Sequence, residues 1–535
     1  MKILHIAAEV APFVSVGGLS QVMYFLPRAL RARGHDVRIF TPRYGAMTYD
    51  ASMEEELCRL DVPIHDTPSI TTRGGAPQSE NDYLATALEY GGASAPGVVS
   101  RITANARPRK KTTIPCSLSF FHNKKERLFT YFLANKEYFE LRSNVFGYAD
   151  DHVRFALFSK ACLEWLALCA RQKSSERAWW PDLIHCHDWH ASYFIEYARR
   201  NQRYHALLKT PIVLTVHNFR YQGNRDFRNV SEHDRDSGHT QLPPLTSKQL
   251  INKNPLKRGL LFADAVTTVS PTHAREILDH QYAEGLDDVI PALSKKFTGI
   301  LNGIDTTEFN PETDPWIKKT YTRKTAPYAR IINKKDLQHT FGLPVNPKAV
   351  LVAFVGRLVT QKGVELLLEA FPRILEERPA LQLIVLGGGE ERFRKNCESL
   401  KQLFPQQVGL HLEADFRLPR KIFAGADCMV FPSTFEPCGI TTLEALRYGA
   451  VPIVRRTGGL NDSITDFNPE TKSGNGISFH KTTSWALYGA LIEMLFLYRQ
   501  KDLWRALVDN CLASDFSWEY AAKDYEKWYK KTISH

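Results

Sequence analysis

The stretch KILHIAAEVAPFVSVGGLSQV, residues 2–22, decides the expected fold of this chain of 535 residues. A short apolar run leads through a loop to Gly17 and Gly18, and a helical pattern begins there. Such a strand-turn-helix unit crowds backbone N–H groups beside the positive end of the helix dipole. We therefore expect Gly17 and Gly18 to hold an anion. No Lys or Arg occurs between Glu9 and Arg28, so the neutralising charge must come from elsewhere in the chain.

Short β-branched runs alternate with amphipathic segments over most of the chain, which indicates an α/β fold with parallel sheets. The pattern restarts near residue 349, after the polar stretch Tyr321–Lys348. We therefore predict two Rossmann-like, doubly wound domains that face each other across a cleft, in residues 1–325 and 326–515. The expected strands are Lys2–Ala8, Val37–Pro42, Leu183–Cys186, Ile212–His217, Ala265–Ser270, Gly299–Asn302, Val350–Val355, Gln382–Leu386, Met429–Pro432 and Val451–Val454.

The composition, 43% hydrophobic and 24% charged, is that of an ordinary globular protein. Nine cysteines without a C-x-x-C pair favour reduced thiols in the cytoplasm over disulfides or a zinc site. No apolar run reaches the roughly 18 residues of a membrane span. The net charge of +11 suits acidic ligands, but we predict neither a membrane nor a nucleic-acid partner. We interpret Thr67–Lys111, with its basic run Arg107–Lys111, and Arg225–Ser247 as long surface loops.

Three histidines surround the end of a predicted buried strand in HCHDWHA, residues 185–191. His185 and His187 share one strand face, and His190 lies across a turn. With Asp188 they could ligate a metal, but no second ligand pair with matching spacing occurs, and we predict no metal. A histidine at this end of a strand either faces the ligand crevice or is a satisfied core residue. The pattern leaves both readings open.

Two cations follow a predicted strand in FVGRLVTQKGVELLLEAF, residues 354–371, where Arg357 and Lys362 precede a helical pattern. Apolar residues recur at helical spacing from Val364 to Leu375, so one helix face is expected to be buried. A loop that presents two cations beside a helix N-terminus suits a diphosphate. Two solvated surface charges are the alternative.

A second strand-to-helix loop occurs in FPSTFEPCGITTLEALRYG, residues 431–449. We expect Glu436 and Pro437 to open the helix, with Pro in its first turn. The backbone N–H groups of Gly439, Ile440 and Thr441 are then free to bind an anion. The Glu436 carboxylate suits recognition of a polyol, and a helix-capping role is the alternative.

These residues and others resemble, in fixed order, those of the bacterial glycogen synthase and plant starch synthase family, retaining glucosyltransferases of the GT-B fold. The resemblance runs almost from end to end. Its motifs are VGGL at 16–19, YADD at 148–151, HCHDWHA at 185–191, VHNFRYQG at 216–223, LKRGLLFADAVTTVSPTHAREI at 256–277, ILNGIDTTEFNPETDPWI at 300–317, GRLVTQKG at 356–363, FEPCGITTLEALRYG at 435–449, VRRTGGLNDSI at 454–464, NGISF at 475–479 and DFSWEYAAKDYEKWY at 515–529.

The resemblance implies transfer of glucose from ADP-glucose to the non-reducing end of an α-1,4-glucan, without a metal or other cofactor. It places the acceptor side in residues 1–325 and the donor side in residues 326–515, and returns a helix in residues 516–535 to the first domain. The implied catalytic residues are His187, Arg357, Lys362 and Glu436. The implied substrate-binding residues are Glu9, Ser15, Gly17, Gly18, Asp150, Asn218, Asn254, Cys438, Gly439, Ile440 and Thr441.

The chain departs from the family pattern at three positions. Ser15 stands where the family loop K-x-G-G-L carries a Lys that reaches the donor phosphates. Near position 414 many members of the family carry an aromatic residue that stacks on adenine, and this chain has Ala414 instead. Thr442 replaces the usual Gln. UDP-glucose as donor, another acceptor, and a weakened glucan-binding paralogue therefore remain as alternatives.

Overall fold

Buried apolar strands run in parallel through the centre of each sheet. In the structure, a computed structural model that describes residues 1–65, 112–125, 127–171, 179–280, 282–415 and 417–534, they form two sheets. The predicted loop Thr67–Lys111 lies entirely outside the described residues. The other predicted loop, Arg225–Ser247, is irregular apart from short 3-10 turns. None of the described helices is both long and apolar enough to span a membrane.

The first sheet of the described chain has nine strands in the order β3-β4-β5-β2-β1-β6-β7-β8-β9. β1 pairs in parallel with β2 and β6, whereas β3, β4 and β5 form an antiparallel edge. The strands are β1 Lys2–Ile6, β2 Asp36–Pro42, β3 Glu54–Pro63, β4 Thr113–Asn123, β5 Leu128–Ala134, β6 Leu183–His187, β7 Ile212–Val216, β8 Ala265–Thr268 and β9 Phe297–Gly299.

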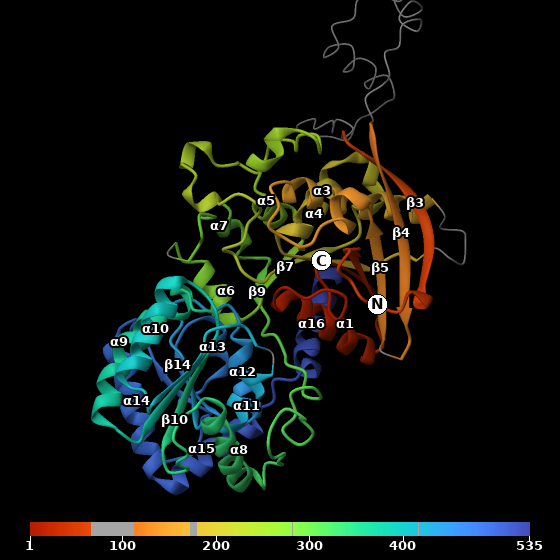
Figure 1. The fold of residues 1–535 in the computed structure, drawn as a ribbon. Coiled ribbons are helices and arrows are strands. Elements are labelled where there is room, and N and C mark those ends of the chain that lie inside the picture. The colour runs from red at the N-terminus through yellow and green to blue at the C-terminus, as the bar shows by residue number, and fades with distance from the viewer. Residues whose placement is uncertain (66–111, 126, 172–178, 281, 416, 535) are drawn as a thin grey trace, which may run out of the picture. The chain divides into compact units, whose positions relative to one another are not determined.

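The second sheet of the described chain has six strands in the order β12-β11-β10-β13-β14-β15, all paired in parallel. Figure 1 shows the helices α9, α10 and α14 on one face of this sheet and α8, α11 and α12 on the other. The strands are β10 Val350–Val355, β11 Leu381–Leu386, β12 Val408–His411, β13 Cys428–Phe431, β14 Val451–Arg455 and β15 Ile477–Phe479.

The helices follow the amphipathic pattern, as α9 illustrates: its apolar residues Val364, Leu367 and Phe371 are buried against the second sheet. This burial of one helix face is the main source of stability for such a segment. The helices are α1 Gly18–Ala32, α3 Asp151–Arg171, α4 Asp188–Arg200, α5 Pro255–Phe262, α6 Pro271–Ile277, α7 Ile290–Leu293, α8 Ala326–Thr340, α9 Val364–Glu377, α10 Glu391–Leu403, α11 Leu418–Gly425, α12 Ile440–Arg447, α13 Gly458–Ser463, α14 Ser484–Arg499, α15 Lys501–Ala513 and α16 Trp518–Ser534.

The described chain divides into two compact units. The first unit comprises Met1–Pro27, His35–Leu214 and Tyr221–Asp264, and the second comprises Arg28–Gly34, Thr215–Arg220 and Ala265–His535. Within the second unit, α16 is held by an ion pair between Arg33 and Glu526 and by a bridge between Ile304 and Ser517. The domain boundaries predicted from the sequence stay a prediction.

Each of the ten predicted strands corresponds to a strand of the structure. Their ends differ by at most two residues, except that the strand expected at Gly299–Asn302 lies earlier, at Phe297–Gly299. The predicted α/β class with two parallel sheets is confirmed.

Candidate active site

The loop between β1 and α1 holds a carboxylate of its own chain. Glu9 is buried, and its Oε2 accepts hydrogen bonds from Val16 N–H at 2.7 Å and Gly17 N–H at 3.0 Å. A Cβ atom on Gly17 would come within 3.3 Å of Glu9 Oε1, so the small residue allows this close approach. Of the two glycines that the sequence suggested for an outside anion, Gly17 thus already donates its N–H to Glu9 in this conformation, which corrects the expectation of an open anion site.

Burial raises the pKa of Glu9, and the nearby Asp188 carboxylate adds to this effect, although the two N–H donors act against it. Burial has this effect because the neutral carboxyl group needs less solvation than the carboxylate. Ser15 lies exposed on the same loop, as do Gly17 and Gly18, and its Oγ lies 2.7 Å from Ser20 Oγ. These three residues can therefore be reached from solvent.

Two histidines from neighbouring strands make a buried hydrogen bond. His5 Nδ1, on β1, lies 2.9 Å from His187 Nε2, at the end of β6. Both rings are fully buried, and burial lowers the pKa of His5 to about 3, so this imidazole is neutral. His5 Nε2 has no hydrogen-bond partner among the described residues. An unpaired N–H costs more than an unpaired ring acceptor, so we assign the proton of His5 to Nδ1, from which it is donated to His187.

A third histidine, His185, completes this buried group. It pairs in register with His5, and the ring nitrogens of His5, His185 and His187 lie within 4.8 Å of one another. These three residues could offer nitrogen ligands to a metal ion. His190, which the sequence grouped with them, lies on α4 and is not part of this cluster. The absence of a metal from the working enzyme stays a prediction.

The turn after β6 has an unusual backbone. His187 occupies the N-cap position of α4 without a capping hydrogen bond from its side chain, and Asp188 adopts the left-handed conformation with φ of 57°. A non-glycine residue in this region costs about 1 kcal/mol or more, and such strain often occurs at functional sites. The turn brings the Asp188 carboxylate close enough to Glu9 to influence its pKa. Glu9, His187 and Asp188 therefore gather at the carboxyl ends of β1 and β6.

Asp150 and Asn254 have structural partners. Asp150 forms an ion pair with Arg142 at 2.7 Å. Asn254 is buried at the N-cap of α5, where its side-chain oxygen accepts Lys257 N–H and its amide donates to Gln222 at 2.8 Å. Their roles in substrate binding remain predictions, because these contacts alone explain both residues.

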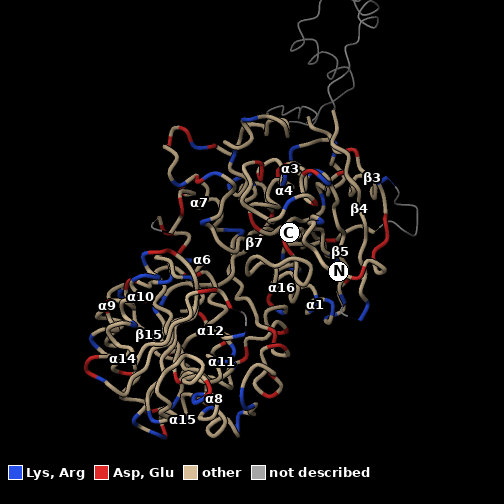
Figure 2. Tube along the Cα trace, in the orientation of Figure 1, with Lys and Arg blue, Asp and Glu red and all other residues tan. Residues whose placement is uncertain are grey.

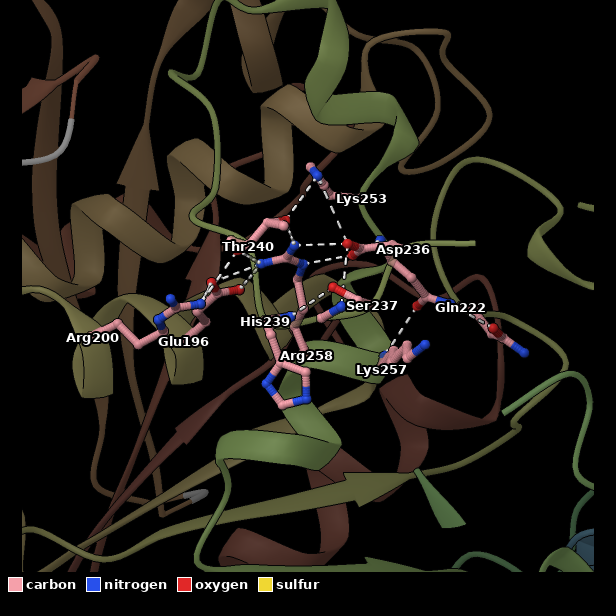
Figure 3. A network of polar contacts seen from close by, with 12 residues as sticks. Glu196, Arg200, Gln222, Asp236, Ser237, His239, Thr240, Lys253, Lys257 and Arg258 are labelled. Carbon is pink, nitrogen blue, oxygen red and sulfur yellow. Dashed lines mark hydrogen bonds and ion pairs between the residues drawn. The ribbon is translucent and has the colours of Figure 1, made fainter. Parts of the chain in front are cut away.

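A buried network anchors the residues around Asn254 (Figure 3). Arg258 is fully buried and donates to both oxygens of Asp236 at 2.7 and 2.8 Å and to Glu196 at 2.8 Å. Asp236 in turn accepts Asn254 N–H at 2.9 Å. Burial alone would raise the pKa of Asp236, but Arg258 and the N–H donors lower it below its ordinary value. The network holds the loop before α5 in place.

In the second unit, the loop after β10 is fastened to the loop after β13. Gln361 donates to the carbonyl of Phe435 at 3.1 Å, and its own carbonyl accepts Thr434 N–H at 2.9 Å. Gly363 has a φ of +68°, and a Cβ atom there would lie 2.0 Å from the Pro432 carbonyl oxygen. Only glycine fits this position. The close approach of the two loops brings together the functional residues that they carry.

Lys362 and Glu436, each expected to be a catalytic residue, make one of these contacts. Lys362 Nζ donates to Glu436 Oε2 in an ion pair, and Ser433 Oγ donates to the same oxygen at 3.1 Å. Arg455 is buried and donates to the carbonyls of Ser433 and Thr434, which fixes the loop. The Glu436 carboxylate is therefore held by two side chains, Lys362 and Ser433, rather than solvated. Capping of α12, the alternative reading for this residue, is not seen.

Arg357 and Asn218 are less constrained. Arg357 lies exposed in the loop after β10, and it makes no ion pair with another described residue. Asn218 follows β7, and its side-chain oxygen accepts Arg220 N–H at 3.0 Å. A positive charge without a partner can neutralise an anionic ligand without first breaking an internal contact.

The helix after Glu436 starts later than expected. α12 begins at Ile440, with Gly439 as N-cap at φ of 78°, so Pro437 lies before the helix and not in its first turn. The reason is that Glu436, Pro437 and Cys438 run along the glycines of α13: a Cβ atom on Gly458 would lie 1.9 Å from the Glu436 carbonyl oxygen. The N–H groups of Ile440 and Thr441 belong to the first turn and have no acceptor within the helix.

Cys438 is a buried neutral thiol. Burial raises its pKa to about 12, so it is neither a nucleophile nor a metal ligand at neutral pH. Its backbone carbonyl packs against Gly459, where a Cβ atom would lie 1.9 Å away. The residue therefore contributes shape rather than charge to the site.

Sequence reasoning missed several residues that position the site. His5 supports His187, Ser433 and Gln361 support Glu436 and its loop, and Gly458 permits the backbone path after Glu436. His5 carried a signal, because it is a polar residue within an apolar strand. The others could be identified only once the loops were seen in contact.

Comparisons with known proteins cover nearly the whole chain. Residues 2–88 and 94–292 match the starch synthase catalytic domain, and residues 337–502 match the glycosyl transferases group 1 family. Glycogen synthase from Desulforamulus reducens is 34% identical over 538 residues, which cover 100% of this chain and 99% of that protein. Glycogen synthase from Geotalea daltonii is 35% identical over 541 residues, with the same coverage.

Solved structures agree with this assignment. The catalytic domain of starch synthase IV from Arabidopsis thaliana, bound to ADP and acarbose, has a TM-score of 0.75 and 31% identity, covering 100% of this chain and 99% of that one. Sucrose-phosphate synthase from Thermosynechococcus elongatus, with a TM-score of 0.54 and 17% identity over 100% of this chain and 99% of that one, shows the shared fold alone. The chain belongs to the family of bacterial glycogen synthases and plant starch synthases, glycosyltransferases with the GT-B fold.

Proposed function

We propose that this glycosyltransferase moves glucose from ADP-glucose to the non-reducing end of an α-1,4-glucan, with retention at the anomeric carbon. The donor would bind to residues 326–515 and the glucan to residues 1–325. One observation carries the proposal: Lys362 and Glu436 form an ion pair at the carboxyl ends of β10 and β13, on loops that also present Arg357 and the first turn of α12. Cations, a carboxylate and free N–H groups are the chemistry that a sugar diphosphate requires.

The cations would act on the leaving group. When the bond between the glucose C1 atom and the diphosphate oxygen breaks, negative charge builds up on the phosphate. Arg357 and Lys362 would stabilise that charge more strongly in the transition state than in the ground state. The acceptor hydroxyl would attack from the same face and pass its proton to the departing phosphate. We propose no role for a metal ion in this step.

The remaining site residues would orient the sugar. Glu436, already held by Lys362 and Ser433, would accept hydrogen bonds from sugar hydroxyl groups, with Cys438 shaping the wall. Gly439, Ile440 and Thr441 would donate N–H groups to phosphate. We assign Glu9, Ser15, Gly17, Gly18, Asp150, Asn218 and Asn254 to substrate binding. His187 would act near the transferred glucose, although its Nε2 already bonds to His5.

The base of the donor is the least constrained part of the proposal. Starch synthase IV from Arabidopsis thaliana was solved with ADP, which supports ADP-glucose for this chain. Ser15 stands in place of the family Lys, and the exposed Ala414 stands in place of an aromatic; with these two departures UDP-glucose is the second candidate donor. We also propose a cytoplasmic location, because all nine cysteines are free.

The proposal is tested by following labelled glucose into glycogen. The full-length chain is incubated with glycogen and either labelled ADP-glucose or labelled UDP-glucose, and label in precipitated glucan is counted. Digestion of the product by β-amylase, which removes only α-1,4-linked chain ends, reports the linkage. We expect incorporation from ADP-glucose that β-amylase releases. Incorporation only from UDP-glucose would reassign the donor, and incorporation from neither would refute the proposal.

A further inference from the structure

A cavity of about 1230 Å³ lies at the edge of the second sheet opposite to the candidate active site. Lys348, which lines it, precedes β10, and Asp427, which also lines it, directly precedes β13. Arg357 and Glu436 follow the same two strands at their other ends. The cavity and the candidate active site are therefore separated by the length of the strands.

The cavity is strongly basic. Eight Lys and Arg residues line it against three Asp residues. They come mainly from α8, from α15 and from the segment before α8, and Figure 2 shows basic residues around both helices. A concave surface lined by one sign of charge concentrates ligands of the opposite charge.

Two of these basic residues are neutralised by Asp residues that also line the cavity. Lys334 is buried, and its Nζ donates to Asp427 Oδ2 at 2.6 Å and to the Tyr498 hydroxyl at 3.3 Å. Burial alone would lower the pKa of Lys334, but Asp427 and Tyr498 raise it above its ordinary value, so the ammonium stays charged. Arg323 forms an ion pair with Asp509. Within each pair the positive and negative charges cancel. The pair of Lys334 and Asp427 is buried, whereas that of Arg323 and Asp509 is exposed.

The rest of the charge is uncompensated. Arg330 donates to the backbone carbonyls of Phe423, Ala426 and Tyr448, so no carboxylate neutralises it. Five more basic residues are exposed and form no ion pair with another residue that the structure describes: Lys324, Lys348, Lys472, Lys501 and Arg505. Asp502 is the one remaining carboxylate among the residues that line the cavity.

An aromatic wall adjoins these cations. The rings of Tyr498 and Trp504 lie 5.1 Å apart at 69°, and Lys501 Nζ lies 4.7 Å from the Tyr498 ring centre. An aromatic ring can cover the apolar face of a sugar or a base, while the cations beside it bind phosphate. We propose that this cavity is a second ligand site, which binds a small molecule that carries a phosphate group. The ligand's phosphate could be part of a sugar phosphate or be free inorganic phosphate.

Calorimetric titration of the full-length chain tests this proposal with ribose 5-phosphate, inorganic phosphate and ribose as probes. The variant K501Q/R505Q removes two exposed charges from the cavity. K523Q/K527Q removes two exposed charges from α16 and serves as the matched control. Lys362→Ala reports binding at the candidate active site. Thermal unfolding of each variant confirms that it folds.

We expect ribose 5-phosphate to bind saturably to the wild type, and ribose not to bind. K501Q/R505Q should weaken binding at least tenfold, whereas K523Q/K527Q and Lys362→Ala should change it less than about twofold. Equal affinity for inorganic phosphate would assign the site to free phosphate, and tighter binding of ribose 5-phosphate would assign it to a sugar phosphate. Absence of saturable binding of both anions, equal losses in the two double variants, or loss only in Lys362→Ala would overturn the proposal. If the cavity binds no phosphate, the proposed transferase activity is not refuted, because it is tested separately by incorporation of labelled glucose.

Discussion

His5 Nδ1 lies 2.9 Å from His187 Nε2, so a histidine on β1 supports the histidine that ends β6. Because both rings are fully buried, removal of the His5 ring takes away this hydrogen-bond partner of His187 Nε2. The contact fixes the tautomer and the ring orientation of His187. His5 is therefore a positioning residue, acting through His187 and not on the substrate.

Replacing His5 should lower turnover more than substrate affinity. We expect His5→Leu to reduce kcat between about tenfold and hundredfold, since small misplacements of a reacting group have effects of this size. His5→Asn, which keeps an N–H donor, should recover part of the loss. Steady-state kinetics with ADP-glucose separates kcat from KM. Equal kinetics for the wild type and His5→Leu would show that the contact has no role in catalysis.

Buried histidines should make the protein acid-labile. Burial lowers the pKa of His190 to about 3, so between pH 3 and its ordinary value of 6.5 the unfolded chain binds a proton that the folded chain does not. Stability therefore falls as the pH decreases through this window, by roughly 1.4 kcal/mol per pH unit for a fully protonated unfolded histidine. His190→Gln should flatten the slope of unfolding free energy between pH 6 and about pH 4.5, measured by urea titration. If the unfolding free energy of the wild type and of His190→Gln had the same pH slope, the pKa of His190 would not be lowered in the folded protein.

Glu444 on α12 should make the protein less stable as the pH rises, the reverse of the effect of His190. Burial raises the pKa of its carboxyl group to about 8, an effect that Arg420 opposes and Glu308 strengthens. From its ordinary value of 4.5 up to about 8, the folded chain keeps a proton that the unfolded chain has lost, so stability falls as the pH rises. Glu444→Gln should therefore gain stability relative to the wild type between pH 5 and 8. A constant difference across this range would refute the shifted pKa.

Position 15, in the loop after β1, can be tested by restoring the lysine that the family carries there. Since a hydrogen bond to a charged group contributes about 1.5–3 kcal/mol, Ser15→Lys should raise kcat/KM for ADP-glucose by roughly one to two powers of ten. Ser15→Gln, a neutral side chain of similar length, controls for size. If the Lys and Gln variants both match the wild type, the loop does not contact the donor phosphates.

The sheet order beyond the central strands could not be predicted, for a physical reason. The strands β10, β11 and β13 are buried on both faces, which leaves continuous apolar runs that can be read from the sequence. β3 is an edge strand, and only two of the ten residues Glu54–Pro63 are buried, so it lacks that pattern. β4 and β5 were missed because they pair antiparallel at the same edge, outside the alternating strand-helix order.

Site residues that directly follow parallel strands could be predicted from the sequence. Contacts that depend on the path of a loop could not. Lys362 and Glu436 are 74 positions apart, yet both follow parallel strands, whose carboxyl ends share one edge of the sheet. By contrast, the bond from Glu9 to the N–H groups of Val16 and Gly17 depends on the exact path of the intervening loop, which no pattern encodes. The partner of His187 depends likewise on strand register, which pairs His5 with His185.

In the proposed reaction, Lys362 stabilises the negative charge on the departing diphosphate. The most direct test of this role is kcat/KM for transfer of labelled glucose from ADP-glucose to glycogen by the wild type, Lys362→Ala and the exposed-lysine control Lys523→Ala. Loss of a charged contact at the leaving group is expected to lower kcat/KM at least about a hundredfold in Lys362→Ala, mostly through kcat, with Lys523→Ala unchanged. Equal kcat values for the wild type and Lys362→Ala, in a folded protein, would show that Lys362 does not stabilise the leaving group.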